Sequence, residues 1–168
     1  MKKLYKVAQE IEKDNKSKMS AGKLLAQSVG LLRGLAILHQ QAHWTSAGNE
    51  YYGDHLLFQR LYDAVSEDID SVAEKLAGVF DPSFLDVGYH ANITKKFIDT
   101  MNTTDNLVER NLKAEKAFVT FNSKIYEKIK ESGEMTLGLD DLIMSVSSKH
   151  EENIYLLQQR LRQNSNSS

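Results

Sequence analysis

Two histidines and several acidic residues in the first half of the chain have the types and spacing that suit metal chemistry. His43 is followed by His55, and Asp63, Asp70 and Glu74 come after it. Histidine nitrogen and carboxylate oxygen together suit Fe(II), and carboxylates also stabilise the Fe(III) that oxidation produces. The 168 residues include no cysteine, which excludes zinc-finger, iron–sulfur and thiol chemistry. Any metal must therefore be bound by His, Asp, Glu or a neutral oxygen.

The acidic residues share one helical face with the second histidine. At about 100° per residue, that face holds His55, Gln59, Asp63, Asp70 and Glu74. His43 can approach His55 across a hairpin, but Glu74 lies roughly 28 Å further along the helix. A second copy, packed antiparallel about a two-fold axis, would bring its own Asp70 and Glu74 to the two histidines. The alternative is a solvated acidic face beside structural histidines.

This arrangement requires two long helices joined by a short turn. Apolar residues at helical spacing predict a helix from Ala21 to about Thr45, which Ser20 can cap, and a second from Tyr51 to about Val79. The turn residues Ser46 to Asn49 lie between them. The two helices should form an antiparallel hairpin.

A second helix pair follows after a long crossover. Asp81-Pro82 ends the preceding helix, and the mixed segment after it has room for a short helix near residues 92–100. Capping residues at 102–105 predict the start of a third helix, which continues to about Glu131 and is stopped by Ser132-Gly133. A fourth helix is predicted over about residues 139–163. Two pairs joined by one crossover predict an all-α, ferritin-like four-helix bundle.

Iron sites inside a single bundle of this kind use a Glu-x-x-His pair on each of two helices. None of the five histidines here has a glutamate three residues before it. We therefore do not expect an iron site within one subunit's bundle.

The start of the chain is basic. Residues 1–24 carry seven lysines against three acids, although the whole chain has a net charge of −2. Lysines can neutralise nucleic-acid phosphates without reading base sequence. The candidate DNA contacts are Lys2, Lys3, Lys6, Lys13, Lys16 and Lys18. The alternative is a solubilising, frayed amphipathic segment.

The expected layout has three parts: a basic extension over residues 1–18, a ferritin-like domain over 19–163 and a disordered tail over 164–168. No run of 18 apolar residues and no signal-peptide pattern occurs. We expect a cytoplasmic protein without membrane contact, associated with the nucleoid if it binds DNA.

At the same residues the chain resembles the Dps family, the miniature ferritins named as DNA-binding proteins from starved cells. The run from His43-Trp44 to Gly48, then His55 and Asp70-x-x-x-Glu74, is similar to that family's ferroxidase signature in residue type and spacing. The resemblance extends from about Ala21 to Arg162 and includes the Asp-Asp pair near the start of the last helix.

The resemblance implies a hollow, spherical dodecamer built from two-fold dimers. Such proteins oxidise Fe(II) between subunits, preferentially with hydrogen peroxide, store ferric mineral and protect DNA from oxidative damage. The implied iron ligands are His43 and His55 of one subunit with Asp70 and Glu74 of its mate. Trp44 would correspond to the family's aromatic residue that traps stray oxidising equivalents, or would serve as an interface anchor.

One position departs from the family pattern. The family commonly has an aspartate where this chain has Gln59, so the second iron position loses an anionic ligand. Asp63 and His39, each one helical turn from an expected ligand, are further candidates to complete it. Zn(II) could occupy the same ligands as a competitor. Acidic residues at Glu131, Glu134, Asp140 and Asp141 could line an iron pore, although surface solvation also explains them.

Two alternative functions remain open. One is a cage that chiefly binds and condenses DNA through the basic extension. The other is a cage with impaired ferroxidase activity, a structural role or a different metal, because of Gln59.

Overall fold

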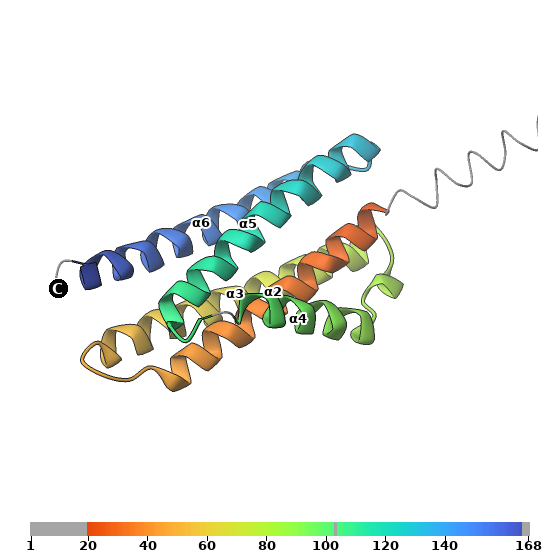
Figure 1. The fold of residues 1–168 in the computed structure, drawn as a ribbon. Helices are drawn as coiled ribbons and strands as arrows, with labels where there is room; N and C mark the ends of the chain where they lie inside the picture. Colours follow the sequence, from red (N-terminus) through yellow and green to blue (C-terminus); the bar gives the residue numbers. More distant parts are fainter. Residues whose placement is uncertain (1–19, 103, 166–168) are drawn as a thin grey trace, which may run out of the picture.

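The computed structural model describes residues 20–102 and 104–165, and its regular elements within those ranges are all helices (Figure 1). The elements are α2 (Ala21–Thr45), α3 (Tyr51–Val79), the 3-10 helix η1 (Pro82–Phe84), α4 (Val87–Met101), α5 (Leu107–Ser132) and α6 (Leu137–Ser165). Two antiparallel pairs, α2 with α3 and α5 with α6, form a four-helix bundle, and the crossover between them carries α4 along α2. The predicted fold class is confirmed.

The first hairpin has the predicted bounds. The Ser20 side chain accepts a hydrogen bond from the backbone N–H of Lys23 at 3.3 Å and so caps α2. At the other end, the Ser46 N–H and hydroxyl both donate to the Ala42 carbonyl. The turn contains Gly48 with φ of +87°, a backbone conformation that favours glycine. Local sequence signals therefore fix both ends of the turn between the two candidate ligands.

The crossover helix is longer than predicted. α4 begins at Val87 rather than near residue 92, because the Asp86 side chain accepts from the Tyr89 N–H and caps an earlier turn. The helix packs closely on α2, where the Thr94 hydroxyl donates to the Gly30 carbonyl at 2.8 Å. The side chain of Ile93 fills the space that a side chain at Gly30 would need.

The last two helices also differ at their ends. α5 is capped by Asn106, whose side-chain oxygen accepts from the N–H groups of Val108 and Glu109 at 3.1 Å, so the predicted caps at 102–105 were wrong. α6 begins two residues before the predicted start and continues to Ser165. Residues 164 and 165 are therefore helical rather than part of the predicted tail. The basic extension predicted over residues 1–18, and residues 166–168, lie outside the described ranges.

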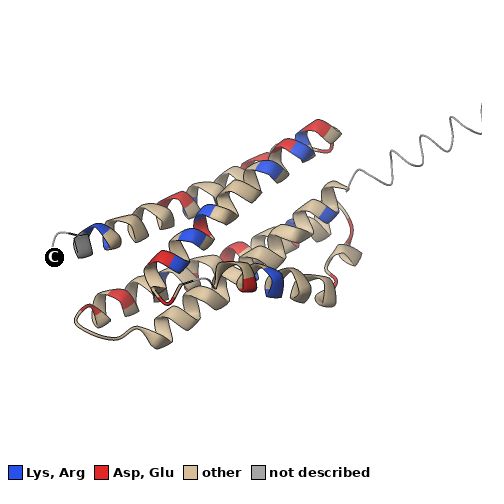
Figure 2. Cartoon of the chain, in the orientation of Figure 1, with Lys and Arg blue, Asp and Glu red and all other residues tan. Residues whose placement is uncertain are grey.

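By length and composition alone, helix α2 could cross a membrane, although Lys23 and Arg33 interrupt its apolar sequence. Figure 2 shows few charged residues along it. However, 67% of the apolar window is buried inside the bundle, as expected for a core helix. Its buried residues include Leu25, Val29, Leu32 and Leu35. They pack against Phe118 and Ile125 of α5, among others, in the main apolar core.

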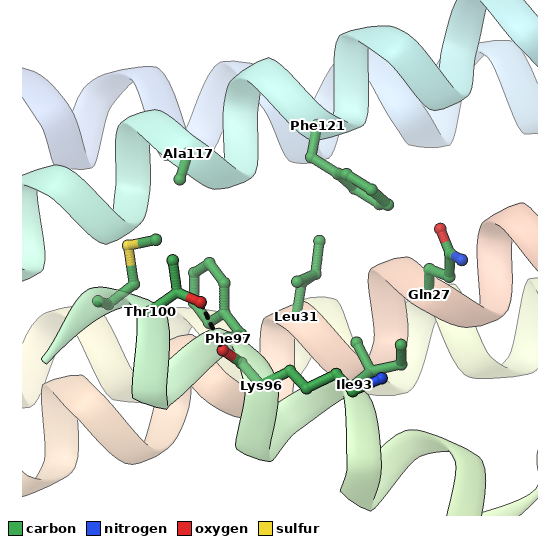
Figure 3. Close-up of a pocket in the computed structure, with 9 residues that line it drawn as sticks. Gln27, Leu31, Ile93, Lys96, Phe97, Thr100, Ala117 and Phe121 are labelled. Carbon is green, nitrogen blue, oxygen red and sulfur yellow. Dashed lines mark hydrogen bonds between the residues drawn. The ribbon is translucent and has the colours of Figure 1, made fainter.

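A pocket of about 330 Å³ lies between α2, α4 and α5 (Figure 3). Leu31, Phe97 and Phe121 give it a mainly apolar lining. The Thr100 hydroxyl there already donates to the Lys96 carbonyl at 2.8 Å. The lining includes neither His43 nor His55, so we do not assign chemistry to this pocket.

Candidate metal centre

His43 near the end of α2 and His55 near the start of α3 stack on each other across the hairpin turn. Their ring centroids are 3.7 Å apart and the ring planes differ by 26°. His43 Nδ1 donates to the backbone carbonyl of His55 at 2.8 Å, and His55 Nδ1 donates to the backbone carbonyl of His43 at 3.0 Å. The two bonds are reciprocal and hold both rings in one orientation.

These bonds determine which nitrogen of each ring is available to a metal. A carbonyl oxygen only accepts, so the proton must lie on Nδ1. In the neutral ring, Nε2 then carries a free lone pair, the arrangement found in metal-binding histidines whose other nitrogen is bonded to a carbonyl. Tyr62 lies edge-on to His43 at 5.4 Å, and the Tyr51 ring is 5.2 Å from His55. The sequence predicted that the histidines meet, but not this reciprocal bonding.

The remaining predicted ligands lie on the outer surface of α3. Gln59, Asp63, Asp70 and Glu74 are all exposed, whereas His55 is half-buried. Among the described residues, no three His, Asp or Glu side chains lie close enough together to bind one metal ion. One copy of the chain therefore offers a histidine pair and a separate acidic stretch.

Large apolar side chains are exposed on the same two helices. The Trp44 side chain is 68% exposed and Tyr52 71%, and Leu56 and Ile37 are each nearly half exposed. Exposed apolar side chains can form a contact with another protein. The two helices that carry the candidate ligands thus also carry exposed apolar side chains that could contact another subunit.

His39 does not belong to this site. It is fully buried and bonds through Nδ1 to Asn111 and through Nε2 to Glu115, both on α5. Both ring nitrogens are occupied, so the prediction that His39 might offer a nitrogen to iron was wrong. The lysines of residues 1–18 lie outside the described ranges. Of the basic residues at the start of the chain, the described part includes Lys23, which is exposed.

The solved structures to which the chain is similar include three Dps proteins. Dps from Listeria monocytogenes matches with a TM-score of 0.70 and 17% identity, over 86% of this chain and 95% of that one. Dps from Thermosynechococcus elongatus matches with a TM-score of 0.67 and 18% identity, over 84% of this chain and 89% of that one. DpsC from Streptomyces coelicolor matches with a TM-score of 0.67 and 23% identity, over 84% of this chain and 83% of that one.

No protein-family model matches the chain. No curated protein matches it either. These three structures share less than a quarter of their residues with the chain. Because the identity is that low, the similarity establishes the fold alone. This chain has the ferritin-like four-helix bundle that these Dps structures share.

Proposed function

We propose that the chain is a Dps-type iron-oxidising and iron-storing protein, which binds Fe(II) between two subunits and oxidises it, preferentially with hydrogen peroxide. The observation that carries the proposal is the reciprocally bonded pair of His43 and His55, which leaves both Nε2 atoms free as ligands. The fold shared with Dps structures supports it independently.

In the proposed site, Fe(II) is the substrate. The two Nε2 atoms supply neutral nitrogen, and Asp70 and Glu74 of a two-fold mate supply anionic oxygen that favours Fe(III). Two Fe(II) ions each lose one electron, and one hydrogen peroxide takes up both to give two hydroxide ions. Consuming the peroxide in this way limits hydroxyl-radical production and so protects DNA. The exposed acidic side chains and the neighbouring Trp44 and Leu56 support placing the subunit contact here.

Peroxide-dependent Fe(II) oxidation, followed by stopped-flow absorbance, tests the assignment. We expect His43→Ala with His55→Ala to abolish it, and Asp70→Asn with Glu74→Gln to do the same. Asp99→Asn and Glu109→Gln are matched controls, because they are exposed acids on α4 and α5. Unchanged oxidation in the double-histidine variant would refute the site.

Mixing the two inactive variants tests whether the site is shared. When subunits lacking the histidines are reassembled with subunits lacking the acids, each mixed dimer regains one intact site. We expect activity to return to the mixture although neither parent has any. If the mixture stays inactive while its subunits exchange, the ligands do not come from two chains.

We also propose that the subunits assemble into a hollow dodecamer with iron inside. Twelve copies of the 19.0 kDa chain give about 230 kDa (12 × 19.0), which light scattering can check. Gln59 should weaken the second iron position, because a neutral carbonyl replaces a carboxylate. The purified cage is loaded with Fe(II) or with Zn(II), and its metal content is then measured. The iron and zinc contents distinguish an active cage from an impaired one or from one that prefers Zn(II).

DNA binding is a second proposal, supported by the seven lysines among residues 1–24. Twelve basic extensions on one particle would add avidity. Gel shifts across a salt series, with and without residues 1–18, test it, because binding through phosphates weakens steeply as salt rises. Unchanged binding after the deletion would refute the role of the extension. A cytoplasmic location, at the nucleoid if DNA is bound, accompanies this proposal.

A further inference from the structure

The pocket between α2, α4 and α5 has a buried apolar floor. Leu31, Phe97 and Met101 form this floor and are 8%, 7% and 6% exposed. Figure 3 shows Leu31 extending from α2, and Phe121 from α5, into the space between the helices. All four side chains also pack in or against the main apolar core. The walls of the pocket therefore belong to the packing that holds the bundle together.

Two glycines of α2 fix the position of the α4 wall. A Cβ atom on Gly30 would lie 2.7 Å from Ile93, and one on Gly34 would lie 2.6 Å from Phe97. Because these two side chains already lie against the α2 backbone, they have no room to move further towards it. The pocket is therefore formed in the absence of a ligand, which lowers the cost of binding one.

The size and composition of the pocket indicate which class of molecule fits. Its volume of about 330 Å³ is close to the lower limit of small-molecule sites, which is roughly 300 Å³. One slender chain suits that volume better than the two chains of a phospholipid or the several anchors of a docked helix. The described residues that line it include neither histidine nor a carboxylate, so the pocket suits binding rather than reaction.

The edge of the pocket carries a positive charge. Lys96 lines the pocket, and Figure 3 shows its side chain extending past Ile93. Within the part of the chain that the structure describes, its ammonium group has no ion pair. The neighbouring Lys95, by contrast, is paired with Asp99 at 2.6 Å. Lys96 is therefore the cation that an anionic ligand would meet.

Two further lysines continue the positive charge along α5. Lys113 is four residues before Ala117, and Lys124 is three residues after Phe121, so both lie on the helical face that lines the pocket. Both are exposed, and the other residues at these spacings from Ala117 and Phe121 are uncharged. The pocket thus combines an apolar interior with a positively charged edge.

We propose that this pocket binds a straight-chain carboxylate of medium length, with its alkyl chain between Leu31, Phe97 and Phe121 and its carboxylate at Lys96. The alkyl chain leaves water for an apolar lining, and the carboxylate stays at the edge, where it keeps most of its hydration. The basic start of the chain is not the occupant, because the seven lysines of residues 1–24 would meet like charge there. The lining shares no residue with the proposed iron site, so each proposal is tested independently of the other.

Calorimetric titration of the full-length protein with sodium hexanoate, octanoate and decanoate tests the fit. We expect one carboxylate per chain and a Kd that falls by about fourfold for each added CH₂ group. Decylamine has the same chain length and the opposite charge at pH 7, and it should bind at least about threefold more weakly than decanoate. A Kd that does not depend on chain length or on the sign of the charge would overturn the proposal.

Three substitutions locate the ligand. Lys96→Gln should weaken decanoate binding by about two- to fivefold and should not weaken decylamine binding. Lys95→Gln removes the same charge from a position outside the lining, so it is the matched control and should change neither Kd. Ala117→Phe places a ring in the pocket and should weaken decanoate binding by about tenfold or more. Decanoate affinity that stays the same in Lys96→Gln and Ala117→Phe would place the ligand elsewhere and refute the site; should Ala117→Phe not fold, the two lysine variants decide.

Other occupants of the pocket would give different results in the same titrations. If a neighbouring subunit closes the pocket, the wild-type protein binds no decanoate. If residues 1–18 fill it, deleting them lowers the Kd for decanoate by about tenfold or more. Either result contradicts the proposal, whereas equal affinity with and without residues 1–18 supports it.

Discussion

Replacing Glu115 with glutamine tests how much the buried carboxylate contributes to stability. Its pKa falls from the usual 4.5 to about 2 in the fold, where His150 and His39 overcome the cost of burial. The difference is about 2.5 units, or roughly 3 kcal/mol at about 1.4 kcal/mol per unit. Because the pKa is lower in the folded state, this stabilisation is present above about pH 4.5 and is lost as pH falls towards 2.

The measurement is urea unfolding, followed by far-ultraviolet circular dichroism, of wild type and Glu115→Gln from pH 7 to pH 2. We expect wild type to be more stable at neutral pH, and the difference to shrink by about 3 kcal/mol on acidification. Glu109→Gln, at an exposed position near the start of the same helix, is the control and should change stability by less than about 1 kcal/mol. Wild-type and Glu115→Gln curves that stay parallel throughout would show that the carboxyl is not ionised in the fold.

Three further substitutions test packing, turn geometry and the second iron position. Gly30→Ala places a Cβ atom 2.7 Å from Ile93 Cβ and should cost about 1–3 kcal/mol in thermal unfolding, whereas Gly53→Ala, with open space around it, should not destabilise. Gly48→Ala puts a side chain at φ of +87° and should cost about 1–2 kcal/mol by the same assay; no loss would mean that the turn rearranges. Gln59→Asp should raise anaerobic Fe(II) binding from one ion towards two per site, measured by calorimetric titration, and unchanged stoichiometry would contradict the role given to Gln59.

The long helices could be predicted because their periodicity extends over many turns. Both bounds of α2 and of α3 follow from the Ser20 cap, the turn around Gly48 and the Asp81-Pro82 stop. The ends of α4 and α5 could not be predicted as well. Several capping residues stand close together there, and the sequence alone does not rank Asp86 and Asn106 above their neighbours.

The meeting of His43 and His55 was predictable because both stand close to one turn of an antiparallel hairpin. The buried bonds of His39 were not, because they join residues far apart in sequence. His39 bonds to Asn111 and Glu115, which are 72 and 76 residues away. A signal was present, since polar residues recur at core positions of α5 and α6, but the pattern does not say which of them pair.

His39 and His43 stand one helical turn apart on α2, yet their partners assign them opposite chemistry. His43 donates one hydrogen bond from Nδ1 to a carbonyl and keeps Nε2 open, which suits a metal ligand. His39 meets side-chain oxygen atoms of Asn111 and Glu115 with both ring nitrogens inside the core, so neither nitrogen is open to a metal. Helical spacing alone therefore cannot separate a metal ligand from a histidine that is bonded inside the core. What separates them is the partner that each ring nitrogen meets: α3 supplies it to His43 across the hairpin, and α5 supplies both partners to His39.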